Sequence, residues 1–257
     1  MSASPQPPPP RRARPGDVVT VDVRDPSDLP PQPPGDFPVA GGQVRTLEIN
    51  TALLDANDRV AAANRKHFKA LGLRVVNLVS SPGAGKTSLL ARTLEALAPE
   101  VRCGVLVGDL ETDNDARRLR HAAVPVAQIT TGSACHLDAG MIARVLDSID
   151  HEGLRLLFVE NVDNLVCPAS FDLGETVRVT LFSCTEGEDK PLKYPPLYKS
   201  AHVVILTKID LAEAAGFDRA AARENVRRMA PQARAIETSA RTGEGVDDWL
   251  GFLRSLL

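Results

Sequence analysis

NLVSSPGAGKTSLLART, the stretch from Asn77 to Thr93, places a loop of small residues between an apolar run and a helical pattern. The loop matches the phosphate-loop (P-loop) pattern G-x-x-x-x-G-K-S/T, except that Ser80 stands at the first glycine. Gly83 and Gly85 allow the backbone to turn its N–H groups onto phosphate oxygens, and the following helix points its positive end at the same anion. The sequence therefore predicts a phosphate-binding site rather than a glycine-rich turn without a ligand.

The side chains that open the helix have expected roles in this site. Lys86 would neutralise charge on the β- and γ-phosphates, and the Thr87 hydroxyl would ligate Mg²⁺. The nucleotide-binding residues expected from the loop are Ser81, Gly83, Ala84, Gly85, Lys86, Thr87 and Ser88.

Apolar runs alternate with amphipathic stretches along most of the chain. Strands are expected at 73–80, 102–108, 124–130, 154–161, 176–183, 202–208 and 233–240. Helices are expected at 45–71, 88–97, 115–123, 137–149, 217–229 and 246–257. This alternation predicts an α/β P-loop NTPase fold, in which a mostly parallel sheet is covered by helices on both faces. Ligands of such sheets bind at the carboxyl ends of the strands.

Proline content divides the chain into two parts. Of the 20 prolines, 12 lie in the first 38 residues, a density that excludes a helix interior or a central strand. We therefore expect residues 1–43 to be a disordered proline-rich tail, with a P-x-x-P ligand segment as the alternative. Residues 44–257 are expected to form one domain that begins with a helix and is long enough for a well-buried core.

Composition and charge argue against several classes of protein. A formal charge of −3 gives no reason to expect nucleic acid or an anionic membrane as a partner. No apolar run approaches the roughly 18 residues that a membrane span requires. Arg11 and Arg12 are not followed by an apolar segment, which argues against a secretory or twin-arginine signal. The four cysteines are widely spaced, which favours reduced thiols in the cytoplasm over a disulfide framework.

LTKID, residues 206–210, ends an apolar strand with the N/T-K-x-D spacing of a base-reading loop. The Asp210 carboxylate can accept hydrogen bonds from the ring N–H and the exocyclic amine of guanine, whereas adenine lacks this pair of donors. The aliphatic stem of Lys208 can lie along the purine face, and Thr207 replaces the more common asparagine. The loop therefore favours a guanine nucleotide.

A second loop supports this interpretation. ETSART, residues 237–242, closes the next strand and resembles the S-A-K/R loop of GTPases. Ser239 and Ala240 therefore join the expected nucleotide site. The order and spacing of the two loops make GTP the expected nucleotide.

Several longer strings carry a more specific resemblance. They are NLVSSPGAGKTSLL, GDLETDNDARRLR, TGSACHLDAGMIA, NLVCPASFDLGE, TEGEDKPLKYP and LTKIDL. On these strings the chain, from about residue 46 onward, resembles the HypB family of GTPases, which help to insert nickel into nickel–iron hydrogenase. Ser80 in place of glycine is usual in that family. The resemblance implies a SIMIBI-type GTPase domain, similar to nucleotide-dependent dimers in which two P-loop domains meet face to face.

The resemblance also implies roles for two carboxylates at strand ends. Asp109 would lie near Mg²⁺ and the attacking water, so that Thr87 and Asp109 are the expected Mg²⁺ ligands. Glu160 would be the acidic residue of the second phosphate-sensing segment, and Lys86, Asp109 and Glu160 are the expected catalytic residues. Taken without the resemblance, either carboxylate could instead cap a helix or face water. The chain has no obvious water-orienting glutamine and no defined arginine finger, so unaided hydrolysis should be slow, about 10⁻⁴ to 10⁻² per second.

Cys135, His136 and Cys167 are candidate ligands for Ni²⁺ or Zn²⁺, because thiolates and imidazole suit both ions. From the residues alone, a buried core thiol is the more common role for each cysteine, and three ligands do not complete a closed four-ligand site. The resemblance implies that metal binds where two GTPase domains meet, since a two-fold interface brings the same residues together twice. We hypothesise that GTP aligns the two loops, closes a homodimer and completes the site.

The remaining cysteines and histidines lack the spacing of metal ligands. Cys103 and Cys184 lie inside strand patterns and are expected in the core. Surface or capping positions are expected for His67, His121, His151 and His202.

The function implied by the resemblance is that of a GTP-hydrolysing metallochaperone that assists nickel insertion into nickel–iron hydrogenase. A HypA-type accessory protein and the hydrogenase large subunit are the implied partners. A urease accessory GTPase is one rival, but its C-P-H triplet is absent here, where the order is Cys135-His136-Leu137. A kinase or ATPase is disfavoured by the LTKID loop. A metal-storage or scaffold protein with a vestigial nucleotide site remains the third alternative.

Two features depart from the family pattern. Residues 1–66 contain no cysteine and no histidine, whereas many relatives carry an N-terminal nickel-holding cluster, so a high-affinity nickel store is not expected here. Asp163 stands where relatives have a glycine that gives its backbone N–H to the γ-phosphate. Aspartate adds negative charge near a phosphate, so weaker discrimination between GTP and GDP is expected. The alternative is that the side chain simply turns to solvent.

Overall fold

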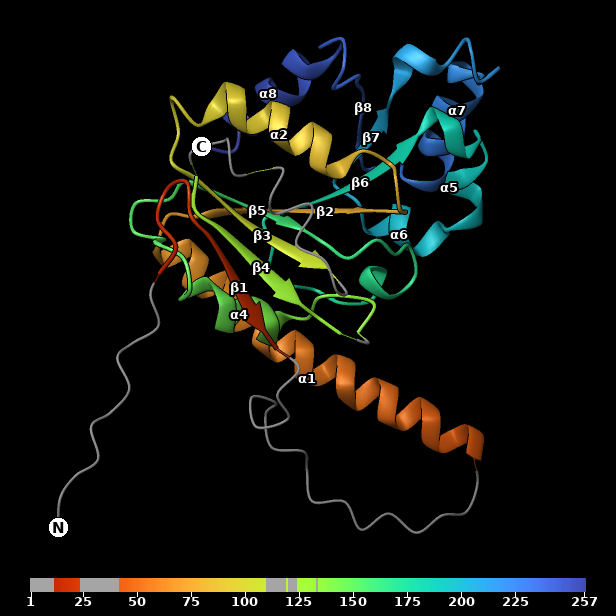
Figure 1. Ribbon diagram of the computed structural model, residues 1–257. Helices are drawn as coiled ribbons and strands as arrows, with labels where there is room; N and C mark the ends of the chain where they lie inside the picture. The colour runs from red at the N-terminus through yellow and green to blue at the C-terminus, as the bar shows by residue number, and fades with distance from the viewer. Residues whose placement is uncertain (1–11, 24–41, 110–118, 120–123, 133) are drawn as a thin grey trace, which may run out of the picture.

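Eight parallel strands form a single sheet in the computed structural model, which describes residues 12–23, 42–109, 119, 124–132 and 134–257 (Figure 1). The strand order is β1-β4-β3-β5-β2-β6-β7-β8. Every neighbouring pair is parallel, which confirms the predicted α/β P-loop architecture. The strands are β1 Val18–Asp22, β2 Arg74–Ser80, β3 Cys103–Asp109, β4 Val126–Thr130, β5 Leu156–Glu160, β6 Val177–Ser183, β7 Val203–Thr207 and β8 Arg234–Glu237.

Helices cover both faces of this sheet. They do so because the strands carry apolar side chains on both faces, and both sets of side chains must be buried. In β2, Val76 and Leu78 join the core under α2 and α8, while Val75 joins the core under α1 and α4. Val79, on the same face as Val75, packs in the core under α6 and α7. The helices are α1 Gly42–Ala70, α2 Lys86–Leu97, α4 Ala139–Leu146, α5 Lys190–Lys193, α6 Pro195–Ser200, α7 Arg219–Met229 and α8 Val246–Arg254.

Two helices begin later than the sequence pattern predicts, because an aspartate caps each one. The Asp138 carboxylate accepts a hydrogen bond from Met141 N at 2.7 Å, so α4 begins at Ala139 instead of residue 137. Asp218 caps α7 in the same way, and that helix begins at Arg219 instead of residue 217. The helix expected at 115–123 lies outside the described residues, apart from the buried Leu119.

The N-terminal segment departs from the expected strand-free tail. Strand β1 pairs with β4 in parallel, with Val18 opposite Val126, and forms one edge of the sheet. Ala13 is fully buried; its N–H donates to the Ser148 carbonyl at 2.8 Å, and its carbonyl accepts from Asp150 N at 2.9 Å. The physical reason is local, since residues 18–23 read VVTVDV, a proline-free run of mostly β-branched residues. An edge strand also needs partners on one side only. Residues 1–11 and 24–41 lie outside the described part of the chain.

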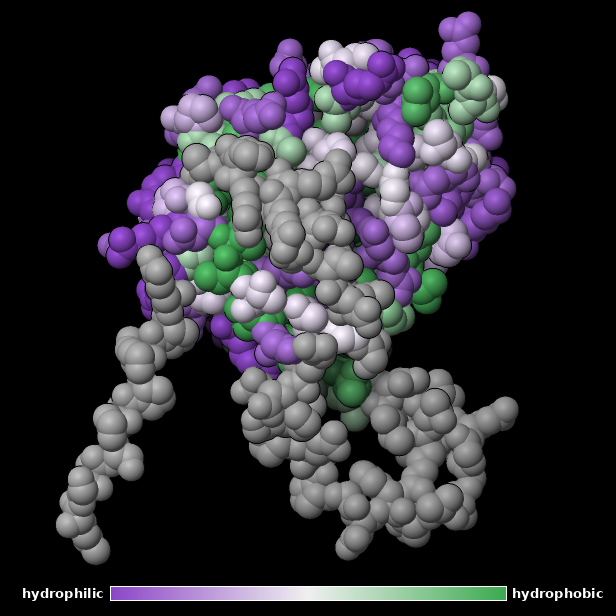
Figure 2. Space-filling model, viewed as in Figure 1, coloured by the Kyte–Doolittle hydropathy of each residue, from purple (hydrophilic) through white to green (hydrophobic). Residues whose placement is uncertain are grey.

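The surface in Figure 2 is mostly hydrophilic over the C-terminal helices, with hydrophobic residues in small groups. Within the described ranges, no helix is both long enough and apolar enough to cross a bilayer.

Candidate functional site

The P-loop follows β2 and leads into α2, at the carboxyl edge of the sheet. Gly83 and Gly85 have φ of 73° and 95°, in the left-handed region that glycine adopts readily. Above Gly83 no heavy atom lies within 4 Å of the place where a Cβ would stand. Ser80 Oγ donates to the Ser81 carbonyl at 2.7 Å and accepts from Lys86 Nζ at 2.9 Å, so the serine at the first glycine position orients the lysine. The two glycines thus adopt the left-handed turns that the predicted phosphate cradle requires.

Lys86 and Ser81 both contact acidic side chains in this structure. Lys86 Nζ forms an ion pair with the Asp163 carboxylate, and the lysine is only 5% exposed. Ser81 Oγ donates to Glu186, whose carboxylate also accepts from Ser183 N at 2.7 Å. Carboxylate oxygens therefore lie against the two P-loop side chains that are expected to face phosphate.

Oxygen ligands gather at the start of α2 and the end of β5. Thr87 Oγ1 donates to Glu160 Oε1 at 2.6 Å, and both residues are buried. Asp109 closes β3, in which Val107 is paired with Glu160, so Asp109 lies at the same edge of the sheet. Hydroxyl and carboxylate oxygens are the donors that Mg²⁺ prefers, and this group of side chains fits that ion. Ser88, also assigned to the nucleotide, is exposed in the first turn of α2.

The predicted base-reading loop is tied directly to the P-loop. Thr207 Oγ1 donates to the Ala84 carbonyl at 2.5 Å, and Lys208 Nζ donates to the Gly83 carbonyl at 2.6 Å. Lys208 has φ of 57°, the only positive value at a non-glycine residue among those described. A left-handed lysine is strained, and such strain is typical of functional loops. These contacts fix the distance between the base loop and the phosphate loop.

Asp210 lies beside the second GTPase-like loop. Its Oδ1 accepts from Ser239 Oγ at 2.5 Å, and its Oδ2 accepts from Arg241 Nε at 2.8 Å. The hydrogen bond from Ser239, together with Arg241, holds the pKa of the Asp210 carboxyl below its ordinary value despite partial burial. Ala240 is half-buried between the two contacting residues. The carboxylate is therefore ionised and oriented before any base binds.

The three candidate metal ligands converge within the single chain. Their ligand atoms all lie within 4.8 Å of one another, and all three residues are half-buried. Cys135 Sγ is 2.9 Å from Cys167 Sγ and 3.9 Å from His136 Nδ1. Burial lowers the pKa of His136, which keeps the imidazole neutral and able to bind a metal. This cysteine–histidine cluster can offer two thiolates and one imidazole to a borderline-soft ion.

Helix α1 and the loop after Cys167 hold the cluster in place. Asn57 of α1 accepts from Ala139 N at 2.9 Å and donates to the Asp172 carbonyl at 2.8 Å. Asn64, two turns later, donates to the Ala139 carbonyl at 2.8 Å and to the Leu173 carbonyl at 3.1 Å. One helix face therefore binds the segment after His136 and the segment after Cys167 at the same time.

Further contacts link the cluster to its surroundings. Asn164 Nδ2 donates to the Cys135 carbonyl at 3.1 Å, and the His136 ring stacks on Phe171 with centroids 3.8 Å apart. The buried Arg178 guanidinium donates to the carbonyls of Ala169 (3.2 Å) and Phe171 (2.8 Å). The loop that carries Cys167 is thus clamped by side chains from α1 and β6.

The other cysteines and histidines lie outside this cluster. Burial raises the pKa of the Cys103 thiol to about 12, and Cys184 is also buried. His202 Nδ1 accepts from Arg178 N at 3.0 Å, and His151 lies 3.3 Å from the Ile149 carbonyl. His67 is exposed on α1, and His121 lies outside the described residues.

Sequence reasoning missed several supporting residues. Asn57 and Asn64 recur at a seven-residue step, so two polar residues on the buried face of a helix were a signal that could have been used. Glu186 stands in the TEGEDKPLKYP string, although no role was assigned to it. Arg178 and Phe171 gave no signal, because their contacts depend on how distant segments pack.

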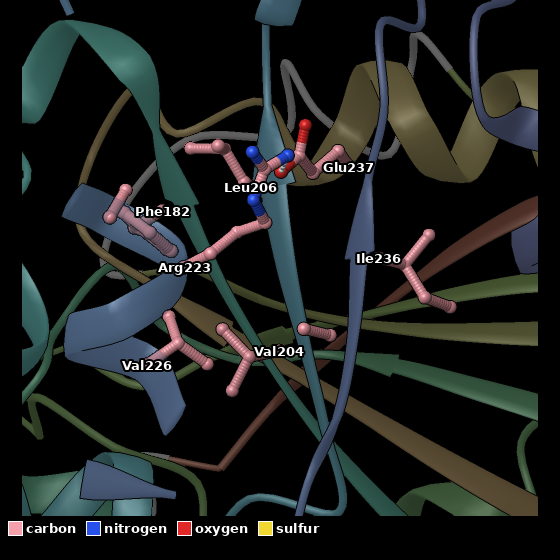
Figure 3. A pocket seen from close by; sticks show the side chains of 9 residues that line it. Phe182, Val204, Leu206, Arg223, Val226, Ile236 and Glu237 are labelled. Atoms are coloured by element: carbon pink, nitrogen blue, oxygen red, sulfur yellow. Dashed lines mark hydrogen bonds and ion pairs between the residues drawn. The ribbon is translucent and has the colours of Figure 1, made fainter. Parts of the chain in front are cut away.

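A small pocket lies apart from these groups, between α7 and the strands β7 and β8 (Figure 3). Its lining is mostly apolar, including Phe182, Val204 and Ile236. The charged pair in its wall, Arg223 and Glu237, forms an ion pair at 2.9 Å. The pocket therefore combines an apolar lining with one ion pair.

Comparison with known proteins matches this geometry. The family model described as the CobW/HypB/UreG nucleotide-binding domain matches residues 74–237. The chain is similar to hydrogenase maturation factor HypB of Azotobacter vinelandii, with 51% identity over 211 residues that cover 82% of this chain and 70% of the relative. Among solved structures, it is similar to HypB from Archaeoglobus fulgidus, with a TM-score of 0.74, 38% identity, and coverage of 79% of this chain and 98% of that one. It is also similar to HypB from Helicobacter pylori in complex with nickel, with a TM-score of 0.73, 38% identity, and coverage of 78% of this chain and 94% of that one.

Proposed function

Because the chain belongs to the HypB family of hydrogenase maturation factors, we propose that it is a GTP-hydrolysing metallochaperone that assists nickel insertion into nickel–iron hydrogenase. The observation that carries the proposal is the convergence of Cys135, His136 and Cys167 at the edge of a P-loop domain. The relative from Helicobacter pylori was crystallised with nickel. Two thiols and an imidazole within 4.8 Å are a donor set that suits that ion.

In this proposal, GTP binding and hydrolysis at the nucleotide site supply the energy for nickel transfer and set its timing. Lys86 binds the β- and γ-phosphates, Asp210 reads guanine, and Asp109 and Glu160 orient the water that attacks the γ-phosphate. Mg²⁺ held by Thr87 and Asp109 would neutralise charge on the phosphates. Among the described residues, the P-loop contacts given above include no glutamine that could orient the attacking water. This supports slow GTP hydrolysis and a timing role.

The metal site is completed by a second copy of the chain in this proposal. One protomer supplies three ligand atoms, and a four-coordinate closed site needs at least one more. A two-fold dimer that forms on GTP binding would bring two cysteine–histidine clusters together, and hydrolysis would loosen them. Zn²⁺ suits the same donors and is the competing occupant.

Partners follow from the family. A HypA-type accessory protein would deliver or receive the ion, and the hydrogenase large subunit would be the destination, in the cytoplasm. Residues 1–66 contain no cysteine or histidine, so this chain would pass nickel on rather than store it.

One experiment tests nucleotide and metal together. The dimer fraction and the bound Ni²⁺ are measured with a non-hydrolysable GTP analogue, with GDP and with neither, for the wild type and Cys135→Ala. We expect the analogue to raise both quantities and Cys135→Ala to lose nickel while keeping nucleotide affinity. Nickel uptake that is indifferent to nucleotide and to the cysteine would contradict the proposal.

A metal-binding scaffold with weak nucleotide turnover is the second candidate, and the ion pair between Lys86 and Asp163 favours it. A lysine engaged by a carboxylate is less available to phosphate. GTP turnover that survives in Lys86→Ala would support the scaffold, because catalysis would then not depend on the P-loop.

A further inference from the structure

Asp163 is bound to the P-loop lysine, although it comes from a different strand end 77 residues away. It stands three residues after Glu160, in the segment that leaves β5. The Asp163 side chain is 44% exposed, whereas the lysine is 5% exposed. The carboxylate therefore reaches in from solvent to a cation that the fold has buried beside Ser80.

The order of strands shows which phosphate this carboxylate would meet. β5 and β6 flank β2, and β7, which carries the base-reading loop, lies beyond β6. A nucleotide with its base at the end of β7 and its phosphates on the loop after β2 directs its terminal phosphate towards β5. Asp163 approaches Lys86 from that same side. P-loop lysines contact the β- and γ-phosphates together, so the two anions would compete for one ammonium group.

We infer that Asp163 is a specificity-determining residue that takes the place of the γ-phosphate on Lys86 and so favours GDP or an empty site over GTP. The inference rests on the proposed function, since it supposes that guanine nucleotides bind here. A diphosphate leaves the γ position vacant, and the ion pair can persist beside it. A triphosphate must displace the carboxylate and then tolerate its charge nearby.

The neighbouring backbone is anchored, so displacement needs only the side chain to turn. Asn161 N donates to the Leu78 carbonyl at 3.0 Å, and Asn161 Oδ1 accepts from Leu137 N at 3.2 Å. On the other side, Asn164 is bonded to the Cys135 carbonyl. Asp163 therefore acts on nucleotide choice while its neighbours keep the cysteine–histidine cluster assembled.

The test compares Asp163→Asn, which removes the charge at nearly constant shape, with Asp163→Gly and a control. Asp150→Asn is the matched control, since Asp150 is also a partly exposed aspartate in an ion pair, with Arg102 at 3.5 Å, but follows α4 beside the amino end of β5. Affinities for GDP and for a non-hydrolysable GTP analogue are measured with Mg²⁺ present. Nickel binding without nucleotide is measured in parallel.

We expect Asp163→Asn to raise the affinity for the analogue relative to GDP about fivefold, the scale of a half-exposed ion pair. Asp150→Asn should leave that ratio unchanged, and nickel binding should be the same in all proteins. A ratio that is equal in Asp163→Asn, the control and the wild type would overturn the inference while leaving the proposed function intact. A wild-type protein that binds neither nucleotide would overturn both.

Discussion

Just after β7 lies the Asp210 carboxylate, the group that is proposed to read the base. Both oxygens of Asp210 already accept hydrogen bonds, from Ser239 and from Arg241. Ser239 is buried and fixed, whereas Arg241 is 72% exposed and can swing away to admit the base. One partner thus orients the carboxylate, and in the proposed function guanine would replace the other.

Exchange of this carboxylate for an amide should change the base that is bound. Asp210→Asn replaces an acceptor by a donor, which suits the C2 carbonyl of xanthine and leaves the guanine amine without a partner. We expect GTP affinity to fall about 100-fold, the scale of one lost hydrogen bond to a charged group, and XTP affinity to rise. Competition binding with the two triphosphates measures this. An equal loss for both would show that the residue supports the fold rather than reading the base.

The sequence could predict candidate residues for the nucleotide loops because each motif is local. Lys86 and Thr87 are adjacent, and Lys208 and Asp210 are two residues apart, so spacing alone places the two members of each pair close together. The contact between Lys86 and Asp163 spans 77 residues and depends on β5 lying next to β2. A local sequence pattern does not show which strands lie next to each other, so the ion pair was not predicted.

At the scale of elements, α1 acts as a brace across the cysteine–histidine cluster. Its Asn57 and Asn64 bond the backbone after His136 and the backbone after Cys167. The fit is close, because a Cβ added at Gly174, whose φ is 83°, would stand 2.6 Å from the Ala61 carbonyl. The helix expected at 45–71 therefore supports the cysteine–histidine cluster as well as the core.

Removing the Asn57 side chain should weaken metal binding more than a surface substitution on the same helix does. Asn57→Ala leaves a backbone N–H and a carbonyl without their side-chain partner, so we expect a loss of about 2 kcal/mol in the free energy of unfolding. We also expect nickel affinity to fall about tenfold, as for other groups that orient metal ligands. Lys66→Ala, exposed on the same helix, is the control.

Urea unfolding and nickel titration separate the two effects of this change. Nucleotide affinity should stay near the wild-type value, because Asn57 contacts neither the P-loop nor the base loop. If Asn57→Ala and Lys66→Ala bound nickel equally well, the brace would have no role in the metal site.

Elements with strong periodicity were predicted well, and β1 shows why one was not. The seven expected strands all occur; six of them are largely buried apolar runs, and the seventh, β8, is an edge strand with Ile236 buried. β1 is short, lies at an edge and is flanked by prolines. In the sequence prediction, the proline content of the segment therefore outweighed the VVTVDV run. Its pairing with β4 is a tertiary contact that the segment's own residues do not specify.

At the scale of the whole molecule, one exposed apolar side chain lies beside the cysteine–histidine cluster. Val166 is 65% exposed and directly precedes Cys167. A dimer that joins two clusters would therefore cover this valine. The proposed dimer would bury Val166 at its centre.

A charge at this position should therefore weaken the dimer. For Val166→Asp we expect the dimer formed with a GTP analogue to dissociate roughly tenfold more readily, because a buried unpaired charge is costly. Leu71→Asp is the control, since Leu71 is 38% exposed but lies before β2, at the opposite edge of the sheet. Sedimentation velocity measures both. Equal dimer stability in the two variants would place the interface elsewhere.

The register of β1 against β4 has a consequence for biosynthesis. Val18 is opposite Val126, so this strand has no partner until more than a hundred further residues have been translated. α1, β2 and β3 are all translated in that interval, so β1 can join the sheet only after later segments have formed the edge on which it pairs. Translation order and assembly order are thus opposite at this end of the protein.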